Sequence, residues 1–337
     1  FENSGQRCPK PILTGVIDVS KPDVLAVAKL HPFYQQALES VYTVHDRTHI
    51  TDPAAFAALA PRIVGVAGTG EASVPRSLLS QLPNAKVVSV FGVGYDGVDV
   101  PAAIEHGIPV THTPDVLTDD VADLAMGLVL SVGRTIPQAD QFVRAGQWPS
   151  GPMALGRKVS GARLGIVGLG RIGKAIARRA SGFGMSIAYT ARTEKTDSGF
   201  KFFATPAELA ANVDFLVVIT PGGAGTKHLI NAQVLKTLGA RGFLINVARG
   251  SVVDEQALIE ALQNGTIAGA GLDVFANEPN VPEVLWGMRN VVLTPHMASA
   301  TTETRQAMAD LAFANMQAGI AGQPLHTPVP ECQAALK

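Results

Sequence analysis

Cysteine and charge are both scarce in this sequence. Its 337 residues include two cysteines, Cys8 and Cys332, near opposite ends of the chain. This excludes a disulfide framework and is typical of a reducing compartment. Charged residues make up 16% of the chain, and 27 basic against 28 acidic side chains leave a net charge of −1. A near-neutral chain offers no electrostatic footprint for nucleic acid or for an anionic membrane, so we expect neither as a partner.

Long apolar runs are missing as well. The most apolar stretch, residues 121–132, contains Asp123 and is shorter than the roughly 20 apolar residues of a transmembrane helix. The N-terminal residues have no apolar core of a signal peptide, and we expect a cytoplasmic protein. Hydrophobic residues make up 47% of the chain, which excludes intrinsic disorder, because disorder requires low hydrophobicity and high charge.

Short runs rich in valine and isoleucine alternate with helical stretches along the chain. This alternation is typical of parallel sheets that carry helices on both faces. A stretch rich in glycine and proline at residues 146–152 is interpreted as a linker. In the first third of the chain we expect strands at residues 12–16, 41–44, 63–67, 87–90 and 109–112.

The alternation restarts more regularly after residue 162. We expect helices at residues 172–183 and 255–263, the second capped by Asp254 before it and by Gly265 after it. Six strands with five connections are the inventory of a complete dinucleotide-binding domain. These six strands are expected at residues 163–167, 186–189, 214–220, 242–247, 268–273 and 291–294.

Two long helices flank this second unit. At residues 116–133 apolar side chains recur at helical spacing, and the second half is apolar nearly all round, which predicts burial inside the protein or against a partner. A last helix at about residues 302–318 is expected to pack back on the first unit. The fold class is therefore α/β with two doubly wound parallel-sheet domains. A Rossmann cofactor domain, residues 116–297, is inserted in a flavodoxin-like substrate-binding domain, residues 1–115 and 298–337.

A glycine-rich turn follows the first strand of the second unit. Gly168, Gly170 and Gly173 match the G-x-G-x-x-G pattern of dinucleotide-binding turns. The three glycines allow a tight turn, close backbone approach to the pyrophosphate and close helix–strand packing. The helix that begins here directs free N–H groups at the phosphates. We therefore expect this turn, together with Arg171 and Ile172, to bind a dinucleotide.

The end of the next strand indicates which dinucleotide is bound. NAD-binding domains place Asp or Glu there to hold the ribose 2′-hydroxyl, whereas an Arg accommodates the 2′-phosphate of NADP. Here the strand ends at Arg192 and Thr193, with Lys195 close by. The alternative is a solvated Arg192, with Glu194 or Asp197 in the place of the acid. We favour NADPH over NADH, because a charge-assisted hydrogen bond is worth about ten- to hundredfold in affinity.

Arg249, Glu278 and His296 follow the last three expected strands. Open α/β sheets bind ligands at the carboxyl ends of their strands, so we expect these side chains to converge. A guanidinium can bind a carboxylate, a His can donate a proton to a ketone oxygen, and a carboxylate beside the His favours the imidazolium. Each residue alone has a structural explanation, but together they suit the reduction of 2-keto acids. No metal site is expected.

In this order, the motifs resemble those of the D-isomer-specific 2-hydroxyacid dehydrogenases. Residues 92–99 resemble the family's substrate-side loop, and residues 113–123 resemble the segment that enters the cofactor domain. Residues 189–193 are similar to the NADPH-preferring glyoxylate/hydroxypyruvate reductase branch. Glu278 argues against formate dehydrogenases, which carry Gln in that role. The glycine-rich residues 222–225 depart from the bulkier polar residues usual in the family.

The resemblance implies roles for the matching positions. Arg249 would bind substrate, His296 would be the acid/base, and Glu278 would orient and charge His296. Val93 and Gly94 would contact the substrate through the backbone. The implied cofactor-binding positions beyond those above are Thr118, Thr220, Pro221, Val247, Ala248, Asp273 (which would hold the nicotinamide carboxamide) and Ser299.

The family resemblance also implies a homodimer, with the helix at residues 116–133 at the interface and Trp148 near the neighbouring subunit's active site. The sequence thus predicts an NADPH-dependent reductase that converts small 2-keto acids, foremost glyoxylate and hydroxypyruvate, into D-2-hydroxy acids. One alternative is a reductase of larger 2-keto acids, such as hydroxyphenylpyruvate or sugar keto acids. An alternative of another class is a non-catalytic nucleotide-sensing scaffold.

Overall fold

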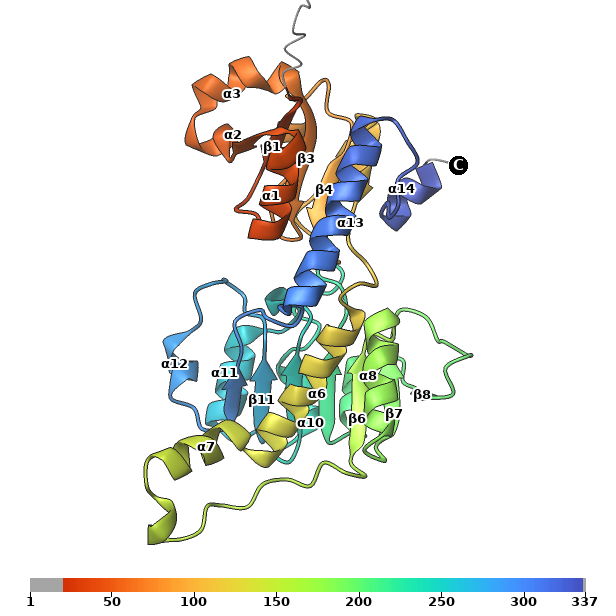
Figure 1. Ribbon diagram of the computed structural model, residues 1–337. Helices are drawn as coiled ribbons and strands as arrows, with labels where there is room; N and C mark the ends of the chain where they lie inside the picture. Colours follow the sequence, from red (N-terminus) through yellow and green to blue (C-terminus); the bar gives the residue numbers. More distant parts are fainter. Residues whose placement is uncertain (1–20, 336–337) are drawn as a thin grey trace, which may run out of the picture.

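In the computed structural model, which describes residues 21–335, the chain forms two lobes that follow one another along a long axis (Figure 1). Each lobe is built on one parallel sheet, of five strands in the first lobe and seven in the second. The chain enters the second lobe after β5 (Val110–Thr111) and returns to the first through α13 (Thr302–Ile320). The predicted fold class, with one parallel-sheet domain inserted in another, is confirmed.

The first lobe has the strand order β2-β1-β3-β4-β5, which is the flavodoxin-like order. The helix α13 packs on α1 and β4, and the Ser89 hydroxyl of β4 donates a hydrogen bond to the Ala312 carbonyl at 2.8 Å. The last helix therefore returns to the first sheet, as predicted. The other elements of this lobe are β1 (Asp23–Ala26), α1 (Pro32–Val41), β2 (Thr43–Asp46), α2 (Thr48–Thr51), α3 (Pro53–Leu59), β3 (Ile63–Thr69), α4 (Arg76–Leu79), β4 (Val88–Phe91), α5 (Val100–Glu105) and α14 (Pro330–Ala335).

The expected strands match β3, β4 and β5 within two residues at each end. The strand expected at residues 41–44 begins too early, because Val41 still belongs to α1. The strand expected at residues 12–16 lies outside the described residues, and β1 at Asp23–Ala26 was not predicted. This strand begins with a buried carboxylate: Asp23 lies 2.7 Å from His45 and 2.8 Å from Arg62. The partners of Asp23 are distant in sequence, but the continuous apolar run at residues 24–28 is a local signal for this buried strand.

The second lobe has the strand order β12-β11-β10-β9-β6-β7-β8. This is the doubly wound Rossmann order with one further strand at an edge. All six expected strands are present within two residues at each end, and Asp254 caps α11 (Glu255–Gln263) as predicted. The strands are β6 (Arg163–Val167), β7 (Ser186–Thr190), β8 (Lys201–Phe202), β9 (Phe215–Val218), β10 (Phe243–Asn246), β11 (Gly269–Leu272) and β12 (Val291–Leu293). The other helices are α8 (Arg171–Ser181), α9 (Pro206–Ala210), α10 (Ala232–Leu238) and α12 (Glu283–Trp286).

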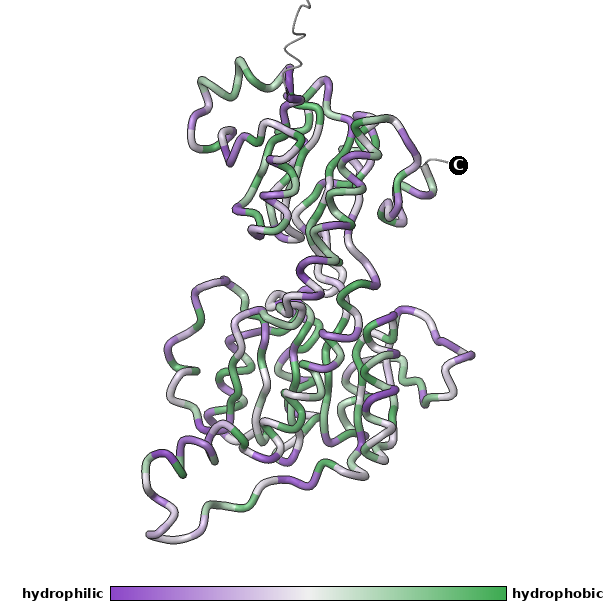
Figure 2. The backbone as a smooth tube through the Cα atoms, in the orientation of Figure 1, coloured by the Kyte–Doolittle hydropathy of each residue, from purple (hydrophilic) through white to green (hydrophobic). Residues whose placement is uncertain are grey.

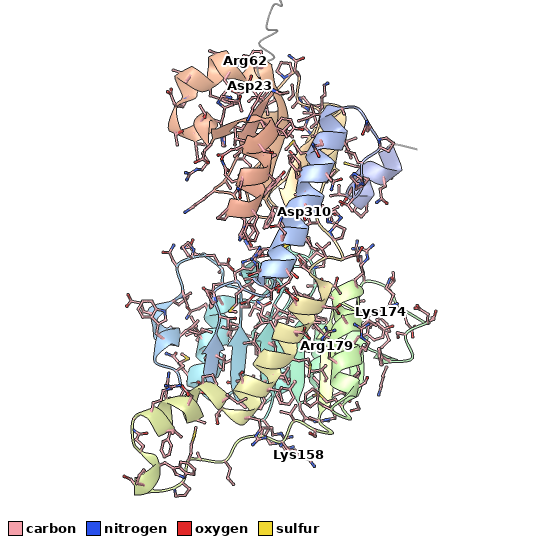
Figure 3. The ribbon with its side chains drawn as sticks, viewed as in Figure 1. Asp23, Arg62, Lys158, Lys174, Arg179 and Asp310 are labelled. Atoms are coloured by element: carbon pink, nitrogen blue, oxygen red, sulfur yellow. The ribbon has the colours of Figure 1, made fainter. Side chains whose placement is uncertain are left out.

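The long helix α6 (Thr118–Arg134) packs against α8 and across β10, β11 and β12. Arg179 of α8 forms ion pairs with Asp119 and Asp123 of α6, and it lies between the two helices in Figure 3. The predicted burial is therefore satisfied by the helix's own lobe, so its apolar face does not by itself require a second subunit.

A projecting segment, residues 135–157, follows α6 and is called the arm here. It contains α7 (Ile136–Arg144) and leaves the body of the second lobe (Figure 1). It returns where Arg157 pairs with Asp214 at 3.0 Å. The glycine- and proline-rich stretch at residues 146–152 is thus part of the arm and does not link the two lobes, because α6 before it already belongs to the second sheet.

Figure 2 shows the apolar strands in the middle of each lobe and hydrophilic segments along the loops. The strands β1, β4, β9, β10 and β11 are buried at every residue, as expected for parallel sheets covered on both faces. Among the described residues, no helix combines the length and apolar character needed to cross a membrane.

Candidate active site

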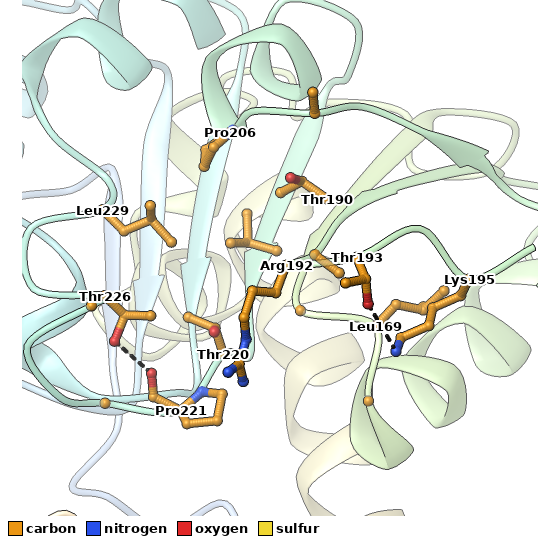
Figure 4. A pocket seen from close by; sticks show the side chains of 17 residues that line it. Leu169, Thr190, Arg192, Thr193, Lys195, Pro206, Thr220, Pro221, Thr226 and Leu229 are labelled. Carbon is orange, nitrogen blue, oxygen red and sulfur yellow. Dashed lines mark hydrogen bonds between the residues drawn. The ribbon is translucent and has the colours of Figure 1, made fainter.

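A cleft of about 790 Å³ opens at the carboxyl ends of β6, β7 and β9 (Figure 4). The chain continues from β6 to β7 on one side and places β9 on the other, so the cleft lies where the strand order reverses, the usual ligand position in such sheets. Six of the predicted cofactor-binding residues line it: Gly168, Gly170, Arg192, Thr193, Thr220 and Pro221.

The glycine turn leaves the space that a pyrophosphate requires. Gly168 has a φ of +105°, and a Cβ there would lie 2.9 Å from the Ile219 carbonyl oxygen. A Cβ on Gly173 would lie 2.2 Å from the Gly168 carbonyl oxygen, so β6 and α8 could not approach as closely. Gly170 has nothing within 4 Å of its Cβ position and precedes α8 without a side-chain cap. The first amide groups of α8 are therefore not covered by a capping side chain.

The loop after β7 gives the cleft a basic edge. Arg192, Thr193 and Lys195 line it, and the Lys195 ammonium lies 3.5 Å from the Thr193 hydroxyl (Figure 4). The two acids that could have replaced the missing carboxylate do not line the cleft. Of these, Asp197 pairs with Lys174 at 3.3 Å. The edge therefore suits a phosphate better than a ribose hydroxyl that needs a carboxylate.

The other predicted cofactor-binding residues surround the cleft less directly. The Thr118 hydroxyl, at the start of α6, is buried and has no hydrogen-bond partner among the described residues, as expected of a group whose partner is a ligand. Arg171 pairs with Asp115 at 2.9 Å. Val247 and Ala248 are buried, whereas Ile172 and Ser299 are partly buried. The buried hydroxyl, the open glycine turn and the basic edge fit a dinucleotide phosphate.

Asp273 holds the loop that carries His296. Its Oδ1 accepts hydrogen bonds from the Thr294 hydroxyl at 2.6 Å and the Met297 amide at 2.9 Å, and its Oδ2 accepts one from the Ala298 amide at 3.0 Å. Burial raises the pKa of this carboxyl, and the three hydrogen bonds oppose that shift. Asp273 is fully buried, and its three hydrogen bonds all go to residues 294–298, the loop that carries the candidate acid.

His296 and Glu278 form a close pair. The imidazole Nδ1 lies 2.6 Å from Glu278 Oε2, and Glu278 Oε1 accepts a hydrogen bond from the Phe275 amide at 2.9 Å. The hydrogen bond to Glu278 raises the pKa of His296, against the effect of burial. Burial alone would raise the pKa of Glu278, but its hydrogen bonds hold that pKa below the usual value. The pair thus favours imidazolium beside carboxylate.

Arg249 reaches from the second lobe to the first. Its Nε lies 3.0 Å from Asp96 Oδ2 and 3.5 Å from Glu71 Oε1, and its Nη1 donates to the Ala248 carbonyl at 2.7 Å. The guanidinium lies directly over Gly94, because a Cβ there would be 1.9 Å from Arg249 Nη2. A side chain at this position would exclude the arginine from the cleft.

The backbone beside this guanidinium is available for a ligand. The Val93 carbonyl oxygen lies 2.8 Å from His112 Nδ1, but within residues 21–335 the amide groups of Val93 and Gly94 donate no hydrogen bond. A second cleft of about 330 Å³ is lined by Arg249 and Glu278 and by two acids of the first lobe, Glu71 and Asp96. The structure thus brings the predicted Arg, Glu and His together at the junction of the lobes.

Sequence reasoning did not single out Glu71 or Asp96 as site residues. Asp96 lies in the glycine-rich loop at residues 92–99, and Glu71 follows the carboxyl end of β3. The strand-end rule that located the candidates of the second sheet, applied to the first sheet, would have indicated Glu71. The apolar lining of the larger cleft was also missed. It includes Leu169, Pro206 and Leu229 (Figure 4).

Comparison with known families supports this arrangement. Residues 126–298 match the family model described as D-isomer specific 2-hydroxyacid dehydrogenase, NAD binding domain. The chain belongs to this family. The match covers the second lobe from within α6 to the loop after His296, and therefore the glycine turn and all three strand ends with candidate catalytic residues.

Individual relatives extend the similarity to the first lobe. The chain is 51% identical over 267 residues to glyoxylate/hydroxypyruvate reductase A of Arabidopsis thaliana, covering 79% of this chain and 85% of that protein. It is 46% identical to hydroxyphenylpyruvate reductase of Plectranthus scutellarioides, covering 91% and 98%. The crystal structure of the NADPH-dependent glyoxylate/hydroxypyruvate reductase from Sinorhizobium meliloti with NADP and malonate has 46% identity and a TM-score of 0.86, covering 93% of this chain and 98% of that one.

Proposed function

We propose that this protein is an NADPH-dependent reductase that converts small 2-keto acids, foremost glyoxylate and hydroxypyruvate, into D-2-hydroxy acids. The observation that carries the proposal is the hydrogen-bonded Glu278–His296 pair beside Arg249, at the junction with the dinucleotide cleft. The relatives named as glyoxylate/hydroxypyruvate reductases support the same substrate class.

Each residue at the junction of the two lobes has a separate role in the reaction. Arg249 binds the substrate carboxylate, assisted by the free amide groups of Val93 and Gly94. Glu278 holds the Nδ1 side of His296, which leaves Nε2 to donate a proton to the keto oxygen. NADPH, when bound, would supply the hydride for the keto carbon. The imidazolium and the guanidinium both stabilise the negative charge that develops on that oxygen.

The cofactor is held by the residues of the larger cleft. The turn at Gly168–Gly173, together with Arg171 and Ile172, would hold the pyrophosphate, and Arg192 with Thr193 would bind the 2′-phosphate. The remaining contacts come from Thr118, Thr220, Pro221, Val247, Ala248, Asp273 and Ser299.

Initial rates test the proposal directly. Hydroxypyruvate and glyoxylate should be reduced with NADPH at a higher kcat/KM than with NADH. Rapid reduction of hydroxyphenylpyruvate together with slow reduction of hydroxypyruvate would instead favour the second candidate, a reductase of larger 2-keto acids, which the relative from Plectranthus supports. Stoichiometric NADPH binding without turnover of any keto acid would favour a nucleotide-sensing scaffold.

Glu278→Gln should shift the pH profile of reduction to lower pH. Reduction needs protonated His296, so activity is lost as pH rises through the His296 pKa, which Glu278 raises. Gln removes the charge that stabilises the imidazolium, and the pKa falls. The measurement is kcat/KM for hydroxypyruvate against pH. Glu255→Gln is the matched control, because Glu255 accepts a hydrogen bond from the nearby Ala276 amide. An alkaline limb that does not move in Glu278→Gln would reject the pairing.

We also propose a homodimer that forms through the arm. Four apolar side chains of the arm are well exposed in one chain: Ile136, Val143, Trp148 and Leu155. Changing Trp148 and Leu155 together to Ser should convert the dimer into monomer, as measured by sedimentation velocity. The control is Trp286→Ser, which removes a Trp of similar exposure, 66% against 68% for Trp148, from α12. A double variant that stays dimeric would place the interface elsewhere.

Two further assignments complete the proposal. The domain boundaries lie at residues 115/116 and 297/298, where the chain passes between the sheets.

The protein works in the cytoplasm, a proposal supported by the low cysteine content and by Cys332, which is buried and free.

A further inference from the structure

The carboxylate of Glu71 faces the candidate catalytic residues from the opposite lobe. It lies two residues after the end of β3 and 3.5 Å from Arg249 Nε. One of its oxygens lies within 4.8 Å of both a His296 ring nitrogen and a Glu278 oxygen. Glu71 therefore adjoins both groups that the proposed function assigns to the substrate, the guanidinium and the imidazole.

Arg249 does not depend on Glu71 for its position. Its Nε already donates to Asp96 Oδ2 at 3.0 Å and its Nη1 donates to the Ala248 carbonyl at 2.7 Å. The Glu71 carboxylate is at ion-pair distance only, and within residues 21–335 it accepts no hydrogen bond from any side chain or amide. Its side chain is 49% exposed and lines the smaller cleft. Glu71 thus presents free acceptor atoms to whatever occupies that cleft.

The charge of the cleft also requires an explanation. Arg249 and a protonated His296 face three carboxylates, from Glu71, Asp96 and Glu278. A site for an anionic substrate gains nothing in electrostatic attraction from a third carboxylate. The charge of Glu71 adds to that of Glu278 in raising the pKa of His296, and its free acceptor atoms can in addition take a hydrogen bond from a donor on the substrate.

We propose that Glu71 is a specificity-determining residue that accepts a hydrogen bond from a hydroxyl group on the substrate carbon next to the keto carbon. This rests on the proposed function. A keto carbon carries three substituents; Arg249 takes the carboxylate, His296 takes the oxygen, and the third adjoins Glu71. The site therefore selects hydroxylated 2-keto acids, such as hydroxypyruvate, over pyruvate, and disfavours substrates with a second carboxylate.

The selection has a clear physical basis. A hydroxyl that donates to an ionised carboxylate makes a charge-assisted hydrogen bond, whereas a methyl group in its place leaves the acceptor without a partner and displaces its water. Sites that hydrogen-bond a substrate hydroxyl reject the analogue that lacks it more strongly than apolar pockets reject an added group. Because Glu71 is half exposed, we expect its hydrogen bond to change kcat/KM by about tenfold, which is the lower end of the range for charge-assisted hydrogen bonds.

The test compares kcat/KM for hydroxypyruvate, pyruvate and oxaloacetate in the wild type, Glu71→Ala and Glu71→Gln. Glu71→Ala should lower the ratio of hydroxypyruvate to pyruvate about tenfold. Glu71→Gln keeps the shape and a neutral acceptor, so it should lower this ratio less but raise kcat/KM for oxaloacetate. Glu39→Gln on α1, which removes an exposed carboxylate bound by Gln35, should leave all three values unchanged.

The outcomes separate this inference from the proposed function. Equal changes for all three substrates would mean that Glu71 acts only through Arg249 or His296, which overturns its role in specificity. Unchanged ratios in both variants would overturn it as well, while leaving the reductase assignment standing. Failure of the wild type to reduce any 2-keto acid with NADPH or NADH would overturn both.

Discussion

His296→Asn should lower kcat for hydroxypyruvate reduction by about 100- to 10,000-fold, the usual contribution of a positioned general acid. Binding of NADPH should stay close to that of the wild type, because His296 does not line the dinucleotide cleft. Asn is the appropriate replacement because His296 has a φ of 50°, in the left-handed region that Asn tolerates better than Ala. A loss of turnover then reports on the proton donor and not on a strained loop.

His228→Asn provides a matched control for this prediction. His228 has a φ of 51°, and its half-exposed side chain lies 3.9 Å from Asp254, outside both clefts. This variant should retain full turnover. Single-turnover rates and NADPH fluorescence titration measure the two properties separately. Turnover by His296→Asn within a few-fold of the wild type would show that the proton comes from another group, and the assignment of the acid would be wrong.

The parts of the fold that the sequence predicts are those with local signals. The strands of the second lobe are continuous apolar runs that end at turn residues, and Gly168, Gly170 and Gly173 mark the first turn within six residues. Because parallel strands share one edge for their carboxyl ends, the sequence positions of Arg249, Glu278 and His296 also predict that they converge. The distance of 2.6 Å between His296 and Glu278 agrees with this reasoning.

Apart from β1, whose apolar run at residues 24–28 is visible in the sequence, the parts that were missed depend on contacts between distant residues. The edge strand β8 has two residues, and it is defined by its pairing with β7. Glu71 stands after the end of a strand, but only its proximity to Arg249 and His296 of the other lobe connects it with the catalytic residues. From the sequence, the apolar surface of α6 could be buried either by a partner or by the protein's own sheet. Only the packing of α6 against β10 and β11 decides between the two.

Arg192→Ala should raise KM for NADPH about ten- to hundredfold and leave KM for NADH nearly unchanged. The guanidinium lines the dinucleotide cleft together with Thr193 and Lys195, where no carboxylate is available for a ribose hydroxyl. The preference should also fall with increasing ionic strength, because an exposed guanidinium–phosphate pair is screened by salt. The control is Arg241→Ala, which should change neither constant. Arg241 is exposed and precedes β10, at the amino ends of the strands and therefore away from the cleft at their carboxyl ends.

Arg192→Asp is a stricter test of the cofactor preference, because it changes the sign of the charge at this position. A carboxylate at the end of β7 repels the 2′-phosphate and can accept a hydrogen bond from the 2′-hydroxyl, so NADH should become the better cofactor. Initial rates of hydroxypyruvate reduction with each cofactor give the two kcat/KM values. Equal losses with NADH and NADPH in both Arg192 variants would mean that the side chain supports the loop without binding the phosphate. Because the two cofactors are compared in the same variant with His296 intact, their ratio does not depend on the assignment of His296.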